Sequence, residues 1–234
     1  MFVAYFRTAA FVLLMAAAGI VAVLAKGGVM TAGAAEIIRL PKPATEGEMS
    51  LEKTLAERRS VRNYADEALS LRQISQMLWA AQGETDSRGF RTAPSAGALY
   101  PLEVFVAAGN VENLSPGIYR YNPETHELAQ TSEGDRRKEL CRAALNQSAA
   151  SRAPAVFVFG AVFERVTGKY GKQGIKYAFM EAGHAAQNLC LQAVSLDLAS
   201  VPMGAFDDKT IQSILNAEKD IRPVYLVPVG KAAK

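Results

Sequence analysis

Three arginines and a serine stand within five residues of each other, in the stretch Arg58-Arg59-Ser60-Val61-Arg62. A guanidinium group presents a planar fork of N–H donors that matches phosphate oxygens, and a serine hydroxyl adds a short neutral hydrogen bond. The cluster therefore suits a phosphate monoester better than a diffuse acidic partner. A charge run can equally be a solvated basic surface, and this stretch alone does not decide between the two interpretations.

The common signatures of side-chain catalysis and of metal binding are missing from the sequence. It contains no phosphate-binding G-x-x-x-x-G-K-[ST], no G-x-S-x-G and no H-E-x-x-H. His126 and His184 are isolated, and Cys141 and Cys190 lie far apart, so neither a metal site nor a disulfide framework is expected. Both cysteines are predicted to be small buried hydrophobic residues. We therefore expect a bound cofactor to carry the chemistry.

The chain of 234 residues, 50% of them hydrophobic and 21% charged, predicts one globular domain with an N-terminal appendage. Arg7 is followed by an uncharged apolar run over residues 8–25. Residues 1–35 are therefore either a cleaved signal peptide or a membrane anchor, and the domain is expected to be exported or membrane-anchored. Without Arg7 and Lys26 the net charge falls from +3 to +1, so a nucleic-acid partner has no electrostatic support.

Hydrophobic periodicity and turn residues divide the rest of the chain into an α+β pattern. Residues 36–48, with two prolines and a glycine, are predicted to be a linker, and residues 49–234 the domain. Helices are expected at 51–59, 71–82, 135–145, 174–198 and 207–216, and strands at 102–108, 117–121, 127–131, 155–162 and 223–229. The run 155–162 suits a strand buried on both faces at the centre of the sheet.

Two further segments carry predictions about packing. The helix at 174–198 is rich in alanine and poor in charge, which predicts burial nearly all round, at a domain centre or in a dimer interface. The segment Phe90 to Pro101 combines two prolines and a glycine with small side chains, so a ligand or a second chain could lie against its backbone. His126, beside a turn, is expected on the surface.

Four motifs together resemble those of the nitroreductase-like FMN flavoproteins, and look closest to the SagB-type branch, which includes the thiazole/oxazole-forming dehydrogenases. The motifs are Arg58–Arg62, Pro94–Pro101, Glu181–Leu189 and Val201–Asp208. The resemblance runs from about residue 50 to residue 231. It implies a nitroreductase-like α+β fold, with a mixed sheet of about five strands flanked by helices around the long buried helix, in an obligate homodimer.

The resemblance also implies which residues bind FMN. The phosphate and ribityl chain would be held by Arg58, Arg59, Ser60 and Arg62, with help from Lys231. A loop of the other subunit would pack along the flavin, so that the site is shared in the homodimer; this loop is Pro94, Ser95, Ala96 and Gly97. The backbone N–H groups of Gly204 and Ala205 would face the flavin N5. Ala98 stands where many nitroreductases have asparagine, so that flavin contact is lost.

SagB-type proteins carry a Lys-Tyr pair before the Glu-x-Gly-His helix, and Lys176 and Tyr177 stand in the matching place. The resemblance assigns proton removal to them in azoline-oxidising members. The alternative is a helix-start pair that faces solvent or the dimer partner. Glu181 and His184, one turn apart, are interpreted as a buried hydrogen-bonded pair that fixes the helix, in preference to an acid/base pair.

The leading hypothesis is an FMN-dependent oxidoreductase that passes hydride or electrons through flavin N5 to a small electrophilic acceptor, such as a nitroaromatic or a quinone, in two half-reactions. NAD(P)H and a membrane-associated donor are the candidate sources of electrons. One alternative is a SagB-type dehydrogenase that oxidises an azoline or another peptide-derived substrate. Another, from a different class, is a non-catalytic flavin-binding or structural domain.

Overall fold

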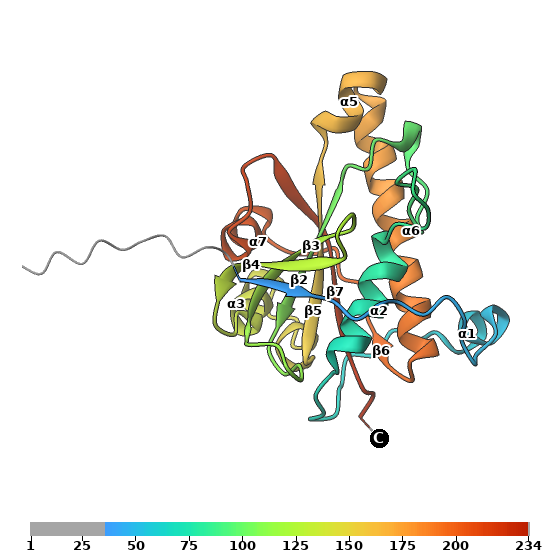
Figure 1. Cartoon of the computed structure of the whole chain (residues 1–234). Coiled ribbons are helices and arrows are strands. Elements are labelled where there is room, and N and C mark those ends of the chain that lie inside the picture. The colour runs from blue at the N-terminus through green and yellow to red at the C-terminus, as the bar shows by residue number, and fades with distance from the viewer. Residues whose placement is uncertain (1–35, 234) are drawn as a thin grey trace, which may run out of the picture. The chain divides into compact units, whose positions relative to one another are not determined.

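Seven strands form a sheet at the centre of residues 36–233, the part of the chain that the computed structural model describes (Figure 1). In chain order they are β1 (Ile37–Arg39), β2 (Leu102–Ala108), β3 (Gly117–Asn122), β4 (Glu127–Glu133), β5 (Ala155–Val162), β6 (Ala199–Ser200) and β7 (Ile221–Gly230). Across the sheet the order is β1-β4-β3-β2-β5-β7-β6, and the paired strands run antiparallel. Parallel pairing within 36–233 is limited to isolated bridges, Ser60 with Ser200 and Leu69 with Val111.

Helices cover both faces of this sheet. They are α1 (Leu51–Glu57), α2 (Leu71–Gln82), α3 (Arg137–Ala143), α4 (Ala149–Arg152), α5 (Glu164–Tyr170), α6 (Gln173–Ser195) and α7 (Asp208–Leu215), with a 3-10 turn, η1 (Ala96–Ala98). In Figure 1, α2 and the long α6 run side by side on one face, whereas α3 and α7 lie on the other. The short α5 packs on the N-terminal end of α6.

Strand β5 explains why the sheet has a hydrophobic core on each side. Successive side chains of a strand point to opposite faces. Phe157 and Phe159 accordingly join the core under α2 and α6, whereas Val156 and Val158 join the core under α3, α4 and α7. All eight residues of β5 are buried, and the strand lies between β2 and β7. The prediction of a central strand buried on both faces is confirmed.

The predicted α+β class is confirmed, and the five expected strands and five expected helices are all present. The sheet nevertheless has seven strands where about five were expected. Strands β1 and β6, of three and two residues, are too short to produce a period-2 pattern. Helix α5 was also not predicted, because its seven residues include Thr167 and Gly168, which are poor helix formers.

Residues 36–48 belong to the domain and are not the free linker that their prolines predicted. Ile38 of β1 pairs with Leu128 of β4. Further along, the N–H of Ala44 donates to Oε1 of Gln76 at 2.8 Å, and Nε2 of Gln76 donates back to the carbonyl of Ala44 at 3.0 Å. This segment, called the strap below, therefore crosses α2, and the compact unit begins near residue 35 rather than at 49.

The predicted signal peptide or membrane anchor, residues 1–35 with the apolar run 8–25, lies outside the described residues. From residue 36 to residue 233, no helix combines the length and the apolar composition needed to cross a bilayer.

His126 is half-buried beneath the strap, so the prediction of a surface residue is wrong. Its Nδ1 lies 2.9 Å from the hydroxyl of Tyr121, and its Nε2 lies 2.8 Å from Oγ of Ser75 and 3.0 Å from the carbonyl of Pro41. Burial lowers the pKa of His126, and the hydrogen bond to Pro41 opposes this shift. The ring thus joins three segments of the chain.

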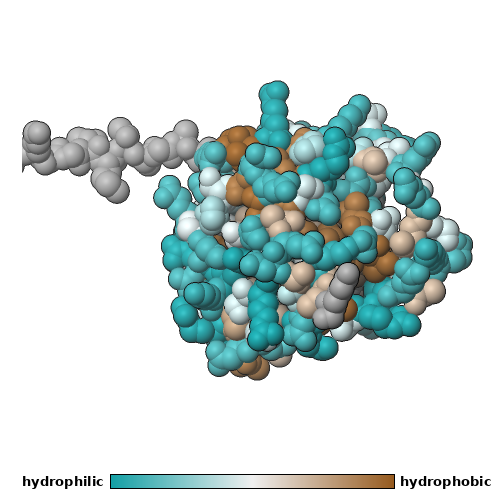
Figure 2. Space-filling view, turned by 90° about the horizontal axis from the view of Figure 1, so that it is seen from below, coloured by the Kyte–Doolittle hydropathy of each residue, from teal (hydrophilic) through white to brown (hydrophobic). Residues whose placement is uncertain are grey.

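Helix α6 is buried along one stripe rather than nearly all round. Its buried face carries alanines and leucines and packs on α2. On the other side Ile175, Phe179 and Met180 are 43%, 53% and 48% exposed, and Gly183 and His184 are also exposed. Figure 2 shows another face of the molecule, where hydrophobic side chains form separate patches on a mainly hydrophilic surface. In the single chain, the apolar side chains of Ile175, Phe179 and Met180 on α6 are therefore only partly covered by other residues.

Candidate functional site

The arginine stretch follows α1 as a segment tied to the ends of β6 and β7. The N–H group of Val61 donates to the carbonyl of Ser200 at 3.0 Å, and that of Ala65 donates to the carbonyl of Lys231 at 2.9 Å. The hydroxyl of Tyr64 donates to the carbonyl of Val61 at 2.8 Å. The far end of the sheet therefore fixes the backbone that carries the arginines.

Side chains of an extended segment alternate in direction, so Arg59 points away from the side that Arg58 and Ser60 share. Arg58, Ser60 and Arg62 occupy every second position, which places them on one side of an extended segment. Between residues 36 and 233, neither Arg58 nor Arg62 has an ion-pair partner. Nη1 of Arg59 instead donates to the carbonyls of Ala56 and Arg58, both at 2.8 Å. Two guanidinium groups and one hydroxyl are thus available to an anion on the same side.

Lys231 lies with Arg59 rather than with the other two arginines. Both line a cavity of about 300 Å³ together with Asp197, and the Lys231 ammonium forms an ion pair with the Asp197 carboxylate. The preceding Gly230 packs so closely that a Cβ would lie 3.0 Å from the Tyr64 ring. The close approach fixes the backbone of Lys231 beside the arginine stretch, while its charge is shared with Asp197.

Gly204 and Ala205 lie in the exposed loop between β6 and α7. Two backbone hydrogen bonds pair Met203 with Leu226 just before them, at 2.7 and 3.0 Å. Within the described part of the chain, the N–H groups of Gly204 and Ala205 have no hydrogen-bond partner. A Cβ at Gly204 would meet no atom within 4 Å. The loop therefore offers two free backbone donors and open space above them.

The arginine stretch and the loop of the two free amides are attached to the same segment of the chain. A backbone bridge joins Ser60 to Ser200, and Gly204 follows Ser200 by four residues. Cys190 of α6 lies near Ser200 and Arg58: burial raises the pKa of its thiol, and the Ser200 hydroxyl and the Arg58 charge oppose the shift. Its full burial confirms the sequence prediction for this cysteine, whereas Cys141 is only partly buried. We call Arg58, Ser60, Arg62, Gly204 and Ala205 the donor cluster.

The loop from Pro94 to Pro101 is held by Glu181 of α6. The Glu181 carboxylate accepts the N–H of Ala96 at 2.8 Å and a hydrogen bond from the Ser95 side chain, and Oγ of Ser95 accepts the N–H of Tyr100 at 2.8 Å. Glu181 is only 4% exposed, and burial raises its pKa. Gly97 has a φ of 64°, and a Cβ there would lie 2.8 Å from the Tyr170 hydroxyl. The loop conformation is thus fixed from both sides.

The expected pair of Glu181 and His184 does not form. His184 is exposed and lies near Glu181 only as a charge, without a hydrogen bond, while Glu181 fixes the loop instead of its own helix. Periodicity could not have shown this, because the partner of Glu181 is a backbone N–H group 85 residues earlier in the chain.

Within one chain the loop and the donor cluster do not meet. The loop is fixed at Glu181, whereas Arg58 of the donor cluster lies near Cys190, nine residues further along α6. A rise of about 1.5 Å per residue puts about 13 Å of helix between them. The fold therefore assembles two separate groups of the residues that the sequence assigned to one site.

Lys176 and Tyr177 lie at the N-terminal end of α6, on the side of the loop. Lys176 is exposed, and the ring of Tyr177 packs edge to face on Tyr170 with 5.2 Å between ring centroids. Tyr170 in turn contacts the position of Gly97. The pair is therefore connected to the loop through Tyr170 and, in the same chain, is remote from Gly204 and Ala205 along α6.

The family of this chain follows from its similarity to known proteins. Residues 55–231 match the model of the nitroreductase family. MJ1384, a nitroreductase candidate of Methanocaldococcus jannaschii, is 45% identical over 184 residues, which cover 79% of this chain and 92% of that protein. The chain belongs to the nitroreductase family.

Two further relatives extend this assignment. The crystal structure of a nitroreductase candidate from Ralstonia eutropha JMP134 superposes with a TM-score of 0.75 at 32% identity, covering 85% of this chain and 90% of that one. The microcin B17-processing protein McbC of Escherichia coli is 29% identical over 164 residues, which cover 67% of this chain and 60% of McbC. Nitroreductase-family membership makes the chain an oxidoreductase by class.

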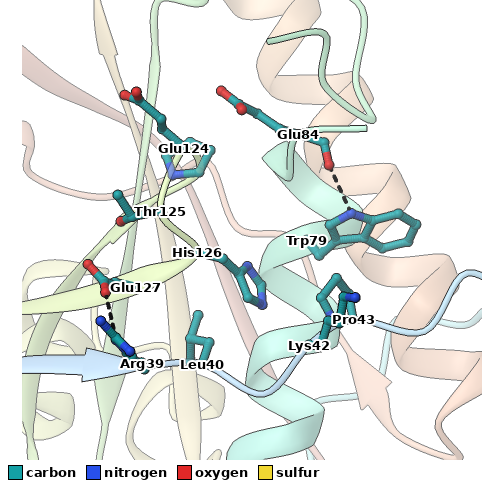
Figure 3. A pocket seen from close by; sticks show the side chains of 11 residues that line it. Arg39, Leu40, Lys42, Pro43, Trp79, Glu84, Glu124, Thr125, His126 and Glu127 are labelled. Carbon is teal, nitrogen blue, oxygen red and sulfur yellow. Dashed lines mark hydrogen bonds and ion pairs between the residues drawn. The ribbon is translucent and has the colours of Figure 1, made fainter. Parts of the chain in front are cut away.

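One large cavity of this nitroreductase-family chain lies away from both groups. It has a volume of about 650 Å³ and opens between the strap, α2 and the β3–β4 turn (Figure 3). Nε1 of Trp79 donates to the carbonyl of Glu84 at 3.3 Å, and Arg39 pairs with Glu127 at 3.4 Å. None of the residues predicted to bind FMN lines it, so this cavity is no part of the candidate site.

Proposed function

We propose that the chain is an FMN-dependent oxidoreductase whose cofactor site is completed by a second copy of the chain. The observation that carries the proposal is the separation along α6 of two incomplete groups. Within residues 36–233 the donor cluster has unpaired cations and free amides, while the loop from Pro94 is fixed at Glu181, about 13 Å along α6 from Cys190. In a homodimer the loop of one subunit can face the donor cluster of the other.

The residues present fit FMN on their hydrogen-bonding capacity. Among residues 36–233, Arg58 and Arg62 have no ion-pair partner, so with Ser60 they offer the donors that a phosphate requires. Arg59 flanks them on the neighbouring cavity and adds positive potential, whereas the charge of Lys231 there is neutralised by Asp197. Gly204 and Ala205 supply free N–H groups for the polar edge of the isoalloxazine ring.

When bound, FMN supplies reversible transfer of two electrons between a donor and an acceptor. The residues of this chain would bind the cofactor and orient the substrate. Gly204 has no Cβ, which leaves room for a small planar substrate. In each subunit Glu181 keeps the loop from Pro94 in one conformation, so that the loop can face the donor cluster of the other subunit. NAD(P)H or a membrane-associated reductant is the proposed donor, and a nitroaromatic or quinone the proposed acceptor.

The exposed apolar surface of α6 supports the homodimer. Ile175, Phe179 and Met180 are about half exposed there, and Leu51 and Leu55 of the neighbouring α1 are 60% and 52% exposed. Side chains of this kind are typical of the core of a dimer interface, which buries about 800 Å² on each partner.

The first experiment is purification of the full chain without added cofactor, followed by its visible spectrum, chromatography of the released flavin and sedimentation velocity. A yellow dimer that releases FMN supports both parts of the proposal. A colourless protein that does not bind micromolar FMN contradicts the enzyme and favours the structural alternative. A yellow monomer contradicts only the shared site.

Phe179→Glu tests the shared site directly. The substitution puts a charge on the apolar face of α6 without touching the donor cluster, so we expect a folded monomer that has lost FMN. Ile37→Glu is the matched control, because it puts the same charge on another exposed apolar residue, 55% exposed, in β1 at the far edge of the sheet. A monomeric Phe179→Glu protein that keeps its FMN would show that one chain suffices.

The similarity to McbC favours a second candidate function, oxidation of an azoline or another peptide-derived substrate. Lys176 and Tyr177 would take the substrate proton, which an exposed position at a dimer interface permits. Lys176→Met should leave electron transfer from dithionite to a quinone intact and abolish oxidation of a thiazoline peptide. Equal loss of both activities would point to a structural role for Lys176.

A further inference from the structure

A second set of arginines, separate from the donor cluster, lines a cavity of about 420 Å³ where β2 begins and β3 ends. Arg91 precedes the Pro94 loop, Arg120 lies in β3, and Arg165 lies in α5. Leu102 and Val104 supply part of an apolar wall. We call Arg91, Arg120 and Arg165 the assembled cluster, because residues far apart in the sequence form it.

The carboxylates in contact with the assembled cluster do not balance its charge. Glu103 bridges two of the arginines: its Oε1 lies 2.5 Å from Nη2 of Arg165, and its Oε2 lies 3.0 Å from Nη2 of Arg120. Glu218 pairs with Arg120 at 2.8 Å. Three guanidinium groups against two carboxylates leave one positive charge without a contacting counter-charge.

Arg91 carries this unbalanced charge. Among residues 36–233 it has no ion pair; its Nη1 donates to Oε1 of Gln82 at 3.1 Å, and its buried Nε has no hydrogen-bond partner. The guanidinium lies over the ring of Tyr100, 4.4 Å from the centroid. Burial lowers the pKa of Arg91, and the nearby charges of Glu84 and Glu103 oppose the shift. Arginine remains charged even so, and therefore requires an acceptor.

We propose that this cavity binds a small organic monocarboxylate. The carboxylate supplies one negative charge and two acceptor oxygens to Arg91, in the planar pairing that a guanidinium favours. The organic part lies against Leu102 and Val104. A phosphate dianion carries more charge than the single cation that lacks a contacting carboxylate, and a neutral molecule would leave that cation without one.

The occupant would lie next to the loop that we assign to the cofactor. The backbone N–H of Arg91 donates to the Tyr100 hydroxyl at 3.3 Å, and Nη1 of Arg165 donates to the Tyr100 carbonyl at 3.0 Å. Tyr100 has a φ of 45° and stands near the end of the loop, so two arginines of the assembled cluster hold a constrained residue. An influence of the bound carboxylate on the cofactor depends on the proposed function, whereas the binding of the carboxylate to Arg91 does not.

Ligand-observed NMR with the full chain tests the site, using propionate, its neutral counterpart propionamide, and inorganic phosphate. We expect saturable binding of propionate, no binding of propionamide, and weaker binding of phosphate. Arg91→Gln should weaken propionate binding at least tenfold. Arg88→Gln is the matched control, since Arg88 lies in the same segment but is exposed and paired with Asp86 at 2.6 Å.

Glu103→Gln is the most discriminating variant. It removes a competing carboxylate and should tighten propionate binding, whereas Arg91→Gln should weaken it. Thermal unfolding checks that each variant is folded, and Arg165→Gln replaces Arg91→Gln if the latter is not. Three results overturn the proposal: no saturable propionate binding, unchanged affinity in Arg91→Gln, or phosphate binding that is tighter than propionate binding and is lost in Arg91→Gln. Weaker binding in Glu103→Gln also overturns it, because the arginines would then act only through the fold.

Discussion

The donor cluster and the assembled cluster both concentrate arginine, but they differ in how their charge is compensated. Arg58 and Arg62 have no ion-pair partner within the described residues, whereas Arg120 and Arg165 share Glu103. A binding site for a strongly charged ligand requires cations that are not already neutralised, and a structural network requires the opposite. Density of arginine is therefore a weaker indicator of a binding site than the absence of partner carboxylates.

The largest effect should come from the donor cluster. The Arg58→Gln, Arg62→Gln double variant should bind FMN at least about a hundredfold more weakly, because each hydrogen bond to a charged group contributes about 1.5–3 kcal/mol. Arg59→Gln should lose less than about tenfold, since its guanidinium donates to two carbonyls and lines the neighbouring cavity. Flavin fluorescence titration of the apoprotein measures both. Equal losses would contradict the separation of Arg59 from Arg58 and Arg62.

Removal of the shared carboxylate should chiefly affect stability. Glu103→Ala leaves Arg165 without its counter-ion and Arg120 with Glu218 alone, so we expect the free energy of unfolding to fall by about 1–3 kcal/mol. Urea denaturation measures the change. Glu127→Ala is the control, because its partner Arg39 is 91% exposed and such a pair contributes about 0–1 kcal/mol. A Glu103→Ala protein as stable as the wild type would make this network dispensable.

The salt dependence of ligand binding should differ between the two clusters, with a smaller effect than those of the substitutions above. Ser60 and Arg62 are exposed, so raising sodium chloride from about 0.05 to 0.5 M should weaken FMN binding several-fold through screening. Propionate binding at part-buried Arg91 should change less. Parallel titrations at the two salt concentrations provide the test, and equal salt dependence would mean that both clusters are equally open to solvent.

The smallest effect concerns Glu181, which holds the loop beside the assembled cluster. Burial raises its pKa in the folded chain, so the charged form is disfavoured there. Its contribution to stability is full below the ordinary carboxyl pKa of about 4.3 and declines as pH rises through the raised value. The melting temperature of Glu181→Gln, relative to the wild type, should therefore increase between about pH 4 and pH 7. A constant difference across this range would contradict the raised pKa.

The two clusters also mark how far sequence alone could lead. Arg58 to Arg62 could be proposed as a phosphate site from the sequence because they are contiguous, and that role stays a prediction. The assembled cluster was not, because Arg91, Glu103, Arg120 and Arg165 come from four segments with no shared pattern. Only the antiparallel pairing of β2 with β3 and the packing of α5 on α6 bring them together.

Elements with strong periodicity were predicted well, and those that depend on distant partners were not. The five longer strands and five helices follow from their own residues. The strap is stabilised by Leu128 and Gln76, and nothing in its proline-containing sequence indicates those partners. The side of the chain that Arg59 faces depends in the same way on backbone contacts with Ser200.

The attachment of the arginine stretch to Ser200 and Lys231 has a consequence for biosynthesis. These contacts connect residues 61–65 to positions 139 to 166 places later in the chain. During translation the stretch leaves the ribosome long before its supports exist, and contacts of such sequence separation form late in folding. The backbone that carries the arginines can therefore reach its final position only after the chain as far as Lys231 has been synthesised.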